Sequence, residues 1–437
     1  MRTVEHAADE FGGDRLEELP ERVRDALGEL AGAAKEGLLA LSVGVGLGVL
    51  GELLESEVDE VVGPRGRHDP DRVAVRHGRD AGEVTLGGRR VAIERPRVRS
   101  ADGSEEVALE TYRHFAARDV LGRVVLERML AGVSTRRYER TQEPVGAEAD
   151  QAARSTSKSA ISREFVARTR ETLVELMSRR LDDVRLAVLM IDGIVLKERT
   201  TVVALGITTD GVKIPLGLWD GSTENATVAT ALLSDLVDRG LDLEQGVLCV
   251  LDGSKALRKA VRDVLGPVPV QRCVRHKERN VLEHLPERDR PPIKRRLRAA
   301  WALDDHDRAL DQLRQLAADL ERSHPGAAAS LREGVPETLT LTRLGIRGAS
   351  TNPCESMIEC VRRSARNVKR WQSGEMCLRW TAAGMLEAER QFRRVIGHSD
   401  LAKLALAVER DLQRARPDAN AHTSSTPTEE AARFATV

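Results

Sequence analysis

The chain has 437 residues, which is too long for one ordinary core and predicts roughly two to four domains. Its formal net charge is −1, so it is not a basic polyelectrolyte, and any surface for nucleic acid must come from local clusters of Lys and Arg. The odd number of cysteines, five, and a start unlike a cleavable signal exclude a disulfide scaffold and favour a reducing cytoplasm.

Residues 1–75 are predicted to form an N-terminal helical region, because Leu16, Leu19 and Val23 begin an apolar stripe with spacings of three and four. The uncharged stretch 37–51 is shorter than the roughly 20 apolar residues that a membrane-spanning helix needs. It therefore predicts a buried helix or a contact between subunits, and no membrane partner is expected.

Residues 76–108 are predicted to form a β-hairpin that turns at Gly87-Gly88. In an extended strand Arg95, Arg97 and Arg99 would lie on one side. Both a basic hairpin beside DNA and an ordinary solvated face fit this pattern.

Residues 109–183 are predicted to be helical, with helices over 120–130, from Ser134 and from Ser157. Short helices with polar caps suggest a DNA-binding helix-turn-helix, although any three-helix bundle gives a similar pattern. The last helix would direct four polar side chains to the major groove: Lys158, Ser159, Ser162 and Arg163.

Residues 184–274 change to strands that alternate with helices, and the order predicts an RNase H-like mixed sheet. In that arrangement the first and fourth strands are neighbours, because a right-handed crossover returns the chain to the opening strand. The expected strands are 186–191, 201–208, 212–219, 247–251 and 268–274, and the expected helices are 223–239 and 254–265.

Three acidic residues are candidates for a metal site. Asp192 and Asp252 each follow one of the two neighbouring strands, and Glu355 begins a later helix. Carboxylates suit Mg²⁺, for which Mn²⁺ can substitute, and two ions can clamp the attacking and leaving oxygens of a phosphoryl displacement. Taken singly, each Asp-Gly is a common turn, and Glu355 stands at the capping-box position of a helix that begins at Asn352.

Residues 275–344 are predicted to be an all-helical insertion, ending in a short extended piece at 338–342. A basic run near a metal site favours phosphate contacts over a merely solvated face. The cations of this run that we assign to DNA are Lys294, Arg295, Arg296 and Arg298.

Residues 345–398 are predicted to return to the core with a helical stretch broken near Gly374, followed over 399–437 by a helix and a disordered polar tail. Four cations lie at helical spacing from Glu355 and would form a basic ridge on its face: Arg362, Arg366, Lys369 and Arg370.

Cys273 and His276 resemble half of a zinc site, which is weak without a second pair. A structural role at a strand end, with His276 near the acidic site, is favoured. Trp371 and Trp380 are ordinary core candidates, with packing against distorted DNA as the alternative.

Several motifs, taken in order, resemble the bacterial insertion-sequence transposases of the Mutator type, over most of 35–398. The matching segments are Ile191-Asp192-Gly193, Gly217-Leu218-Trp219, Val250-Leu251-Asp252-Gly253, Gln271-Arg272-Cys273-Val274-Arg275-His276 and Ser350-Thr351-Asn352-Pro353-Cys354-Glu355. The resemblance implies a DDE transposase in which Asp192, Asp252 and Glu355 bind two catalytic Mg²⁺ ions, with Cys273, His276 and Asn352 in supporting roles.

The same resemblance implies DNA strand cleavage and 3′-OH strand transfer in the cytoplasm, at the nucleoid. The expected partners are double-stranded DNA, as terminal inverted repeats and target, and further copies of this chain in at least a homodimer. Two rivals stay open: an RNase H-like nuclease without strand transfer, and a non-catalytic DNA-binding regulator.

Overall fold

The computed structural model describes residues 45–67, 72–86, 89–142, 157–197, 199–221, 225–346 and 353–415. The chain divides into two compact units, Met1–Arg168 and Thr169–Val437, and each is treated by itself. The apolar stripe that begins at Leu16, the Gly87-Gly88 turn, Asn352 and the C-terminal tail after residue 415 lie outside the described residues. Within those ranges, none of the helices combines the length and apolar character that crossing a membrane requires.

The first unit contains a three-stranded antiparallel sheet packed against a helix that runs through 45–62. The predicted hairpin is confirmed, and its strands are longer than expected, with Val84 paired to Val91. Leu54 and Val58 of the helix and Val98 of the sheet are buried in one cluster. The elements are β1 Ala74–Leu86, β2 Arg89–Ser100, β3 Glu106–Val107, α4 Glu110–Ala116 and α5 Arg118–Leu130.

The helix predicted from Ser134 is wrong, because the only helical element described between α5 and residue 142 is the short 3₁₀ turn Glu139–Thr141. Tyr138 is fully buried there, beneath the guanidinium of Arg128 at 5.4 Å from the ring centre. Burial of this ring outweighs local helix propensity. The next helix, α7 Lys158–Ser178, forms as predicted, and the Ser157 hydroxyl accepts from the Ala160 N–H at its start.

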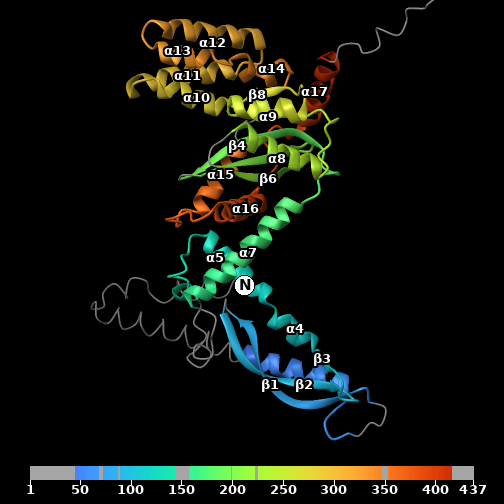
Figure 1. Cartoon of the computed structure of the whole chain (residues 1–437). Coiled ribbons are helices and arrows are strands. Elements are labelled where there is room, and N and C mark those ends of the chain that lie inside the picture. Colours follow the sequence, from blue (N-terminus) through green and yellow to red (C-terminus); the bar gives the residue numbers. More distant parts are fainter. Residues whose placement is uncertain are drawn as a thin grey trace, which may run out of the picture. The chain divides into compact units, whose positions relative to one another are not determined.

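The second unit is built on a mixed five-stranded sheet with the order β6-β5-β4-β7-β8. Figure 1 labels β4, β6 and β8 of this sheet. The first three strands are antiparallel, and β7 and β8 run parallel to β4, so the predicted neighbourhood of the first and fourth strands is confirmed. The strands are β4 Leu186–Leu196, β5 Arg199–Thr208, β6 Lys213–Gly221, β7 Leu248–Leu251 and β8 Val270–Arg272.

Both faces of this sheet are covered by helices, which is why its strands read as continuous apolar runs. Successive β4 residues contribute to the cores on opposite faces of the sheet. Leu189 packs with the first helix pair, and Met190 packs with the later helices. The first pair is α8 Ala226–Asp238 and α9 Lys255–Leu265; the later helices are α15 Pro353–Ser364, α16 Gly374–Gln391 and α17 Leu401–Ala415.

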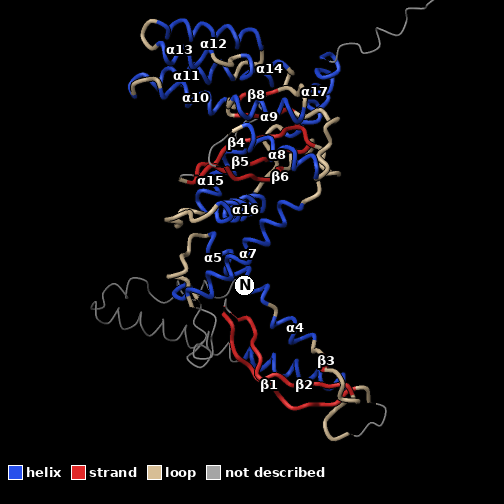
Figure 2. The backbone as a smooth tube through the Cα atoms, in the orientation of Figure 1, coloured by secondary structure: helices blue, strands red, loops and turns tan. Residues whose placement is uncertain are grey.

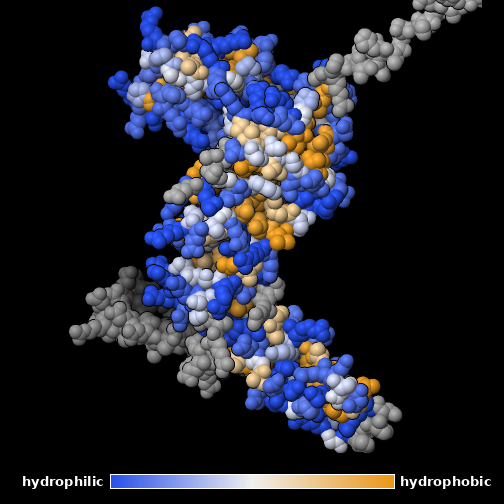
Figure 3. All heavy atoms as spheres, in the orientation of Figure 1, coloured by the Kyte–Doolittle hydropathy of each residue, from blue (hydrophilic) through white to orange (hydrophobic). Residues whose placement is uncertain are grey.

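Between β8 and α15 the chain forms a segment made mainly of helices (Figure 2). This segment has its own core, in which Leu313, Leu316 and Leu331 are buried. The predicted helical character is confirmed, and the outer face of this segment is largely hydrophilic (Figure 3). Its main helices are α10 Val274–Glu283, α11 Arg290–Trp301, α12 His306–Glu321 and α13 Pro325–Arg332.

The extended piece predicted at 338–342 is wrong. The chain forms the 3₁₀ helix η3 Pro336–Leu339 and then α14 Thr340–Arg343. The threonine hydroxyls explain the difference, because Thr338 donates to the Val335 carbonyl and Thr340 to the Val270 carbonyl, at 2.7 and 2.8 Å. These side-chain bonds to the backbone support a helical turn where β-branched residues suggested a strand.

The helix that carries Glu355 packs closely on α16 at a glycine. A Cβ on Gly384 would lie 2.9 Å from the Cα of Val361, so one helix would have to move. We expect Gly384→Ala to lower the free energy of unfolding by about 1–3 kcal/mol through overpacking, measured by denaturant titration. Gly51→Ala is the matched control, because Gly51 lies in a helix and a Cβ there would meet no described atom within 4 Å. This substitution should raise the free energy of unfolding by up to about 1 kcal/mol.

Candidate active site

Asp192 and Asp252 follow two residues that are register partners on neighbouring parallel strands. Ile191 on β4 is the register partner of Leu251 on β7. The predicted strand end at Asp192 is wrong, because β4 continues to Leu196 in its pairing with β5. Only the parallel neighbour β7 stops at Leu251, and this leaves Asp192 beside a strand end.

The turn after β7 directs Asp252 back toward the start of α9. Its Oδ1 accepts from the Ser254 N–H at 2.7 Å, and Gly253 between them has φ +106°. A Cβ on Gly253 would lie 2.3 Å from Nε of Arg272, so both the conformation and the space require glycine. Asp192 Oδ1 accepts from the Gly193 N–H at 2.8 Å.

α10 brings a histidine to Asp192. His276 Nε2 lies 3.8 Å from Asp192 Oδ2, so the expectation that His276 lies near the acidic site is confirmed. Cys273 is buried at the N-cap position of α10, and all five cysteines are free thiols. A hydrogen bond with Cys273 raises the pKa of His276; burial opposes the rise, and the Asp192 carboxylate adds to it.

Asp192 is 9% exposed, and its environment disfavours the ionised form. Burial raises the pKa of Asp192, with a smaller contribution from the Asp252 carboxylate, while His276, the Gly193 N–H and Arg279 act in the opposite direction. The buried carboxylate therefore gains from any additional positive charge placed beside the two aspartates.

Glu355 reaches the same region from α15. Its Oε2 lies 3.7 Å from Nε of Arg275, the residue before His276, and this buried oxygen has no hydrogen-bond partner among the described residues. Cys354, also buried, has its pKa raised well above the usual range, first by burial and then by Asp192, Cys273 and Glu355. Asp192 and Glu355 therefore both lie close enough to Cys354 to raise its pKa.

Sequence reasoning missed Arg275 and Arg279, whose charges lie near Glu355 and Asp192 respectively. Both stand on α10 beside the recognised Cys273 and His276. The helical spacing from 275 to 279 was the available signal, because it places the two residues on one face.

Three carboxylates are the donor set that Mg²⁺ prefers, and Oε2 of Glu355 accepts no hydrogen bond from the residues that the structure describes. Among the residues that the structure describes, however, no three His, Cys, Asp or Glu side chains are grouped so as to hold a metal ion. Instead, Asp192 faces His276 and Glu355 faces Arg275. The chemistry of the three carboxylates nevertheless fits Mg²⁺.

The basic run on α11 is largely paired with acids. Arg298 forms hydrogen bonds with Glu278 at 2.6 and 3.0 Å, Lys294 lies 3.7 Å from the same residue, and Arg296 pairs with Asp319 at 2.5 Å. Arg295 is exposed and has no ion pair within the described part of the chain. Arg295 is therefore the member of this run most open to a new partner.

The predicted basic ridge is wrong in its helical form, because α15 ends at Ser364. Arg362 lies on the helix, whereas Arg366, Lys369 and Arg370 follow it in a loop. The tip of the β4–β5 hairpin supports this loop, since Lys197 Nζ donates to the Lys369 carbonyl. All four predicted cations are exposed, and the last three stand in this loop and not on a continued helix.

The remaining predicted residues are separate from this site in the sequence. Lys158, Ser162 and Arg163 are exposed on the first turns of α7. Arg95 and Arg97 pair with Glu106 at 3.2 and 2.7 Å, which favours the solvated-face interpretation of the hairpin. The core interpretation of the tryptophans is confirmed: Trp380 is 6% exposed, and Trp371 packs against the core around β4.

Comparison with known proteins gives a consistent set of relatives. The sequence profile described as "Transposase, Mutator family" matches residues 31–395. The transposase for insertion sequence element ISRM5 of Rhizobium meliloti is 29% identical over 82% of this chain and 92% of its own length. The transposase for IS1081 of Mycobacterium tuberculosis is 26% identical over 86% and 91%. That for IS6120 of Mycolicibacterium smegmatis is 32% identical over 40% and 56%.

Proposed function

The chain belongs to the Mutator family of transposases and so acts on DNA, and from this premise we propose that it cleaves and joins strands at one carboxylate site. The reaction frees a 3′-OH at each end of an insertion sequence and transfers it to target DNA. Asp192, Asp252 and Glu355 are the proposed catalytic residues, with two Mg²⁺ ions, or Mn²⁺ in their place, as cofactor.

One observation carries this proposal: residues 191 and 251 are register partners on parallel strands, and each is followed by an aspartate. The sheet order β6-β5-β4-β7-β8 supports an RNase H-like core. The segment from α10 to α14 is then the helical insertion, and the helix of Glu355 returns to the sheet after it.

The three carboxylates and the neighbouring Arg275 and His276 have different roles in this mechanism. Asp192 and Asp252 would hold the ions from a fixed strand edge, and Glu355 would complete the set from α15. Bound Mg²⁺ supplies Lewis-acid stabilisation of the attacking and leaving oxygens. Arg275 and His276 are paired with Glu355 and Asp192, and keep these carboxylates compensated before the ions and DNA arrive.

DNA binding is proposed for the exposed cations in both units. Lys158, Ser162 and Arg163 on α7 are assigned to terminal inverted repeats, where base contacts specify sequence. Arg295, Arg362 and the loop cations 366, 369 and 370 are assigned to phosphates, with Lys294, Arg296 and Arg298 exchanging acidic partners for DNA. Pairing two ends requires at least a homodimer.

A strand-transfer assay with a pre-cut DNA end tests the proposal and separates its rivals. We expect joined product that depends on Mg²⁺ or Mn²⁺ and on a free 3′-OH. Cleavage of an uncut end without any joined product would identify a nuclease instead. DNA binding with neither cleavage nor joining would identify a regulator. Ca²⁺, which takes oxygen ligands in looser geometry, is the matched control and should give no joined product.

A further inference from the structure

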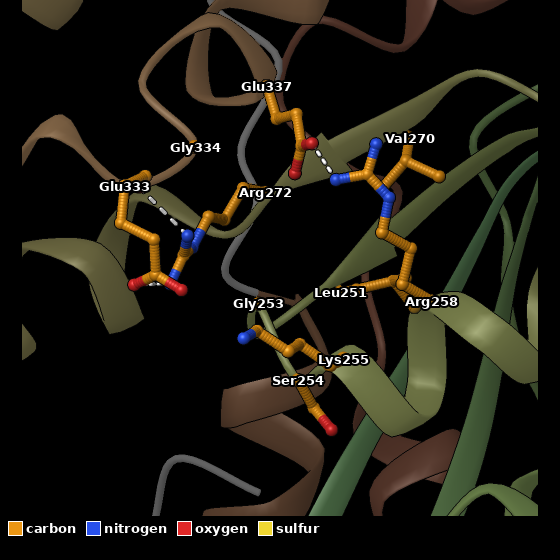
Figure 4. A pocket seen from close by; sticks show the side chains of 10 residues that line it. All are labelled: Leu251, Gly253, Ser254, Lys255, Arg258, Val270, Arg272, Glu333, Gly334 and Glu337. Carbon is orange, nitrogen blue, oxygen red and sulfur yellow. Dashed lines mark hydrogen bonds and ion pairs between the residues drawn. The ribbon is translucent and has the colours of Figure 1, made fainter.

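A pocket of about 240 Å³ lies beside Asp252, at the junction of the sheet with the end of the helical segment. Gly253, Ser254 and Lys255 line it from the start of α9, whereas Glu333 and Glu337 come from the other side (Figure 4). Since Gly253 directly follows Asp252, any group held in this pocket would be close to the proposed catalytic edge.

Among the described residues that line the pocket, one cation has no acidic partner. Arg272 donates to the Glu333 carbonyl at 2.9 Å and to its carboxylate at 3.3 Å, and Arg258 pairs with Glu337 (Figure 4). Lys255 is exposed and has no hydrogen bond or ion pair within the described residues. The pocket therefore carries a net positive charge, and Lys255 is the side chain free to bind an anion.

Two further donors support an anion in this position. The Nε of Arg272 is buried and has no acceptor in the part of the chain that the structure describes, on a side chain that is 6% exposed. The pocket also adjoins the N-terminal end of α9, where Ser254 is the N-cap and unpaired backbone N–H groups carry positive partial charge. A lysine, a buried arginine donor and a helix N-terminus around one cavity suit a phosphate group.

We propose that this pocket binds a backbone phosphate of the DNA substrate, with Lys255 as the principal contact. The inference rests on the proposed function, since it takes DNA to be the ligand. The two arginine–glutamate pairs serve as its walls: they neutralise the glutamates that would otherwise repel the phosphate. The contact fixes the strand beside Asp252 without reading its sequence.

The test compares lysine variants in the full-length protein by fluorescence anisotropy on a labelled DNA duplex, over a series of salt concentrations. Lys255→Gln is expected to weaken binding about fivefold to tenfold and to reduce the slope of log affinity against log salt by about 0.9, as the loss of one phosphate contact requires. Lys255→Arg should keep the slope. Lys259→Gln is the matched control, because Lys259 lies on the same helix and pairs with Asp263.

The outcomes separate this inference from the function beneath it. If the wild-type protein binds no duplex, both proposals fail. If the wild type binds and Lys255→Gln keeps the affinity and salt slope of Lys259→Gln, only the phosphate pocket is overturned. Thermal melts of the variants verify that the exposed substitution leaves the fold intact.

Discussion

Asp192→Asn is expected to reduce strand cleavage and strand transfer on the order of 10³-fold or more. The substitution keeps the shape of the side chain and removes the charge that an ion at this edge requires, and metal stabilisation of the transition state amounts to several kcal/mol. Gel assays of cleavage and joining measure the loss. Asp238→Asn, at an exposed position on α8, should retain full activity.

The same variant separates lost chemistry from lost structure. Burial raises the pKa of Asp192, so the folded protein ionises it at a cost that asparagine avoids, and the variant should melt no lower than the wild type without divalent ions. Mg²⁺ at ten times its dissociation constant should stabilise the wild type by about 1.4 kcal/mol and leave the variant unchanged. An equal Mg²⁺ shift in both proteins would contradict binding at Asp192.

Lys277→Met is expected to lower the stability of the helical segment by about 2–4 kcal/mol. The Lys277 side chain is fully buried, and its Nζ donates to the carbonyls of Ser330 and Glu333 at the end of α13. Methionine fills the volume and leaves these carbonyls without that donor. Hydrogen exchange of the α13 amides, followed by mass spectrometry, measures the loss, and Lys259→Met on the exposed face of α9 should change nothing.

A pH series gives an independent check on this lysine. Burial, with a further contribution from Arg272, lowers the pKa of Lys277 to about 8. Above that pH the native state holds fewer protons at this site than the unfolded chain does, so stability rises with pH until the unfolded lysine titrates near about 10.4. The free energy of unfolding of the wild type should therefore rise relative to that of Lys277→Met between about pH 8 and pH 10. A constant difference over that range would mean that Lys277 stays charged.

The sequence was sufficient to predict the order of the strands in the five-stranded sheet, because that order follows from local patterns. The apolar runs before Asp192 and Asp252, the closely spaced strands 201–208 and 212–219 and the intervening helices predicted the strand order, because crossover handedness leaves few alternatives. Periodicity could not show where β4 ends, since a strand paired on one side continues beyond the point where its other neighbour stops.

The errors arose where tertiary contacts outweigh local signals. Nothing in the sequence between Ser364 and Gly374 breaks a helix, yet α15 ends there and the loop is fixed by a lysine on a distant hairpin. Arg275 was not recognised because its partner Glu355 is brought to it only by the folded sheet. The burial of Tyr138 and the hydroxyl bonds of Thr338 and Thr340 likewise depend on the folded chain.

The order of the elements along the chain has a consequence for synthesis on the ribosome, because α15 and α17 follow the strands that they cover. Leu404 and Val408 of α17, with Met357 of α15, cover the face of the sheet that includes Val188 and Met190. A nascent chain that has emerged only as far as α14 holds both aspartates, but it lacks the glutamate and leaves this apolar face bare. Until α15 and α17 have emerged, this apolar face is exposed and is a target for chaperones and proteases.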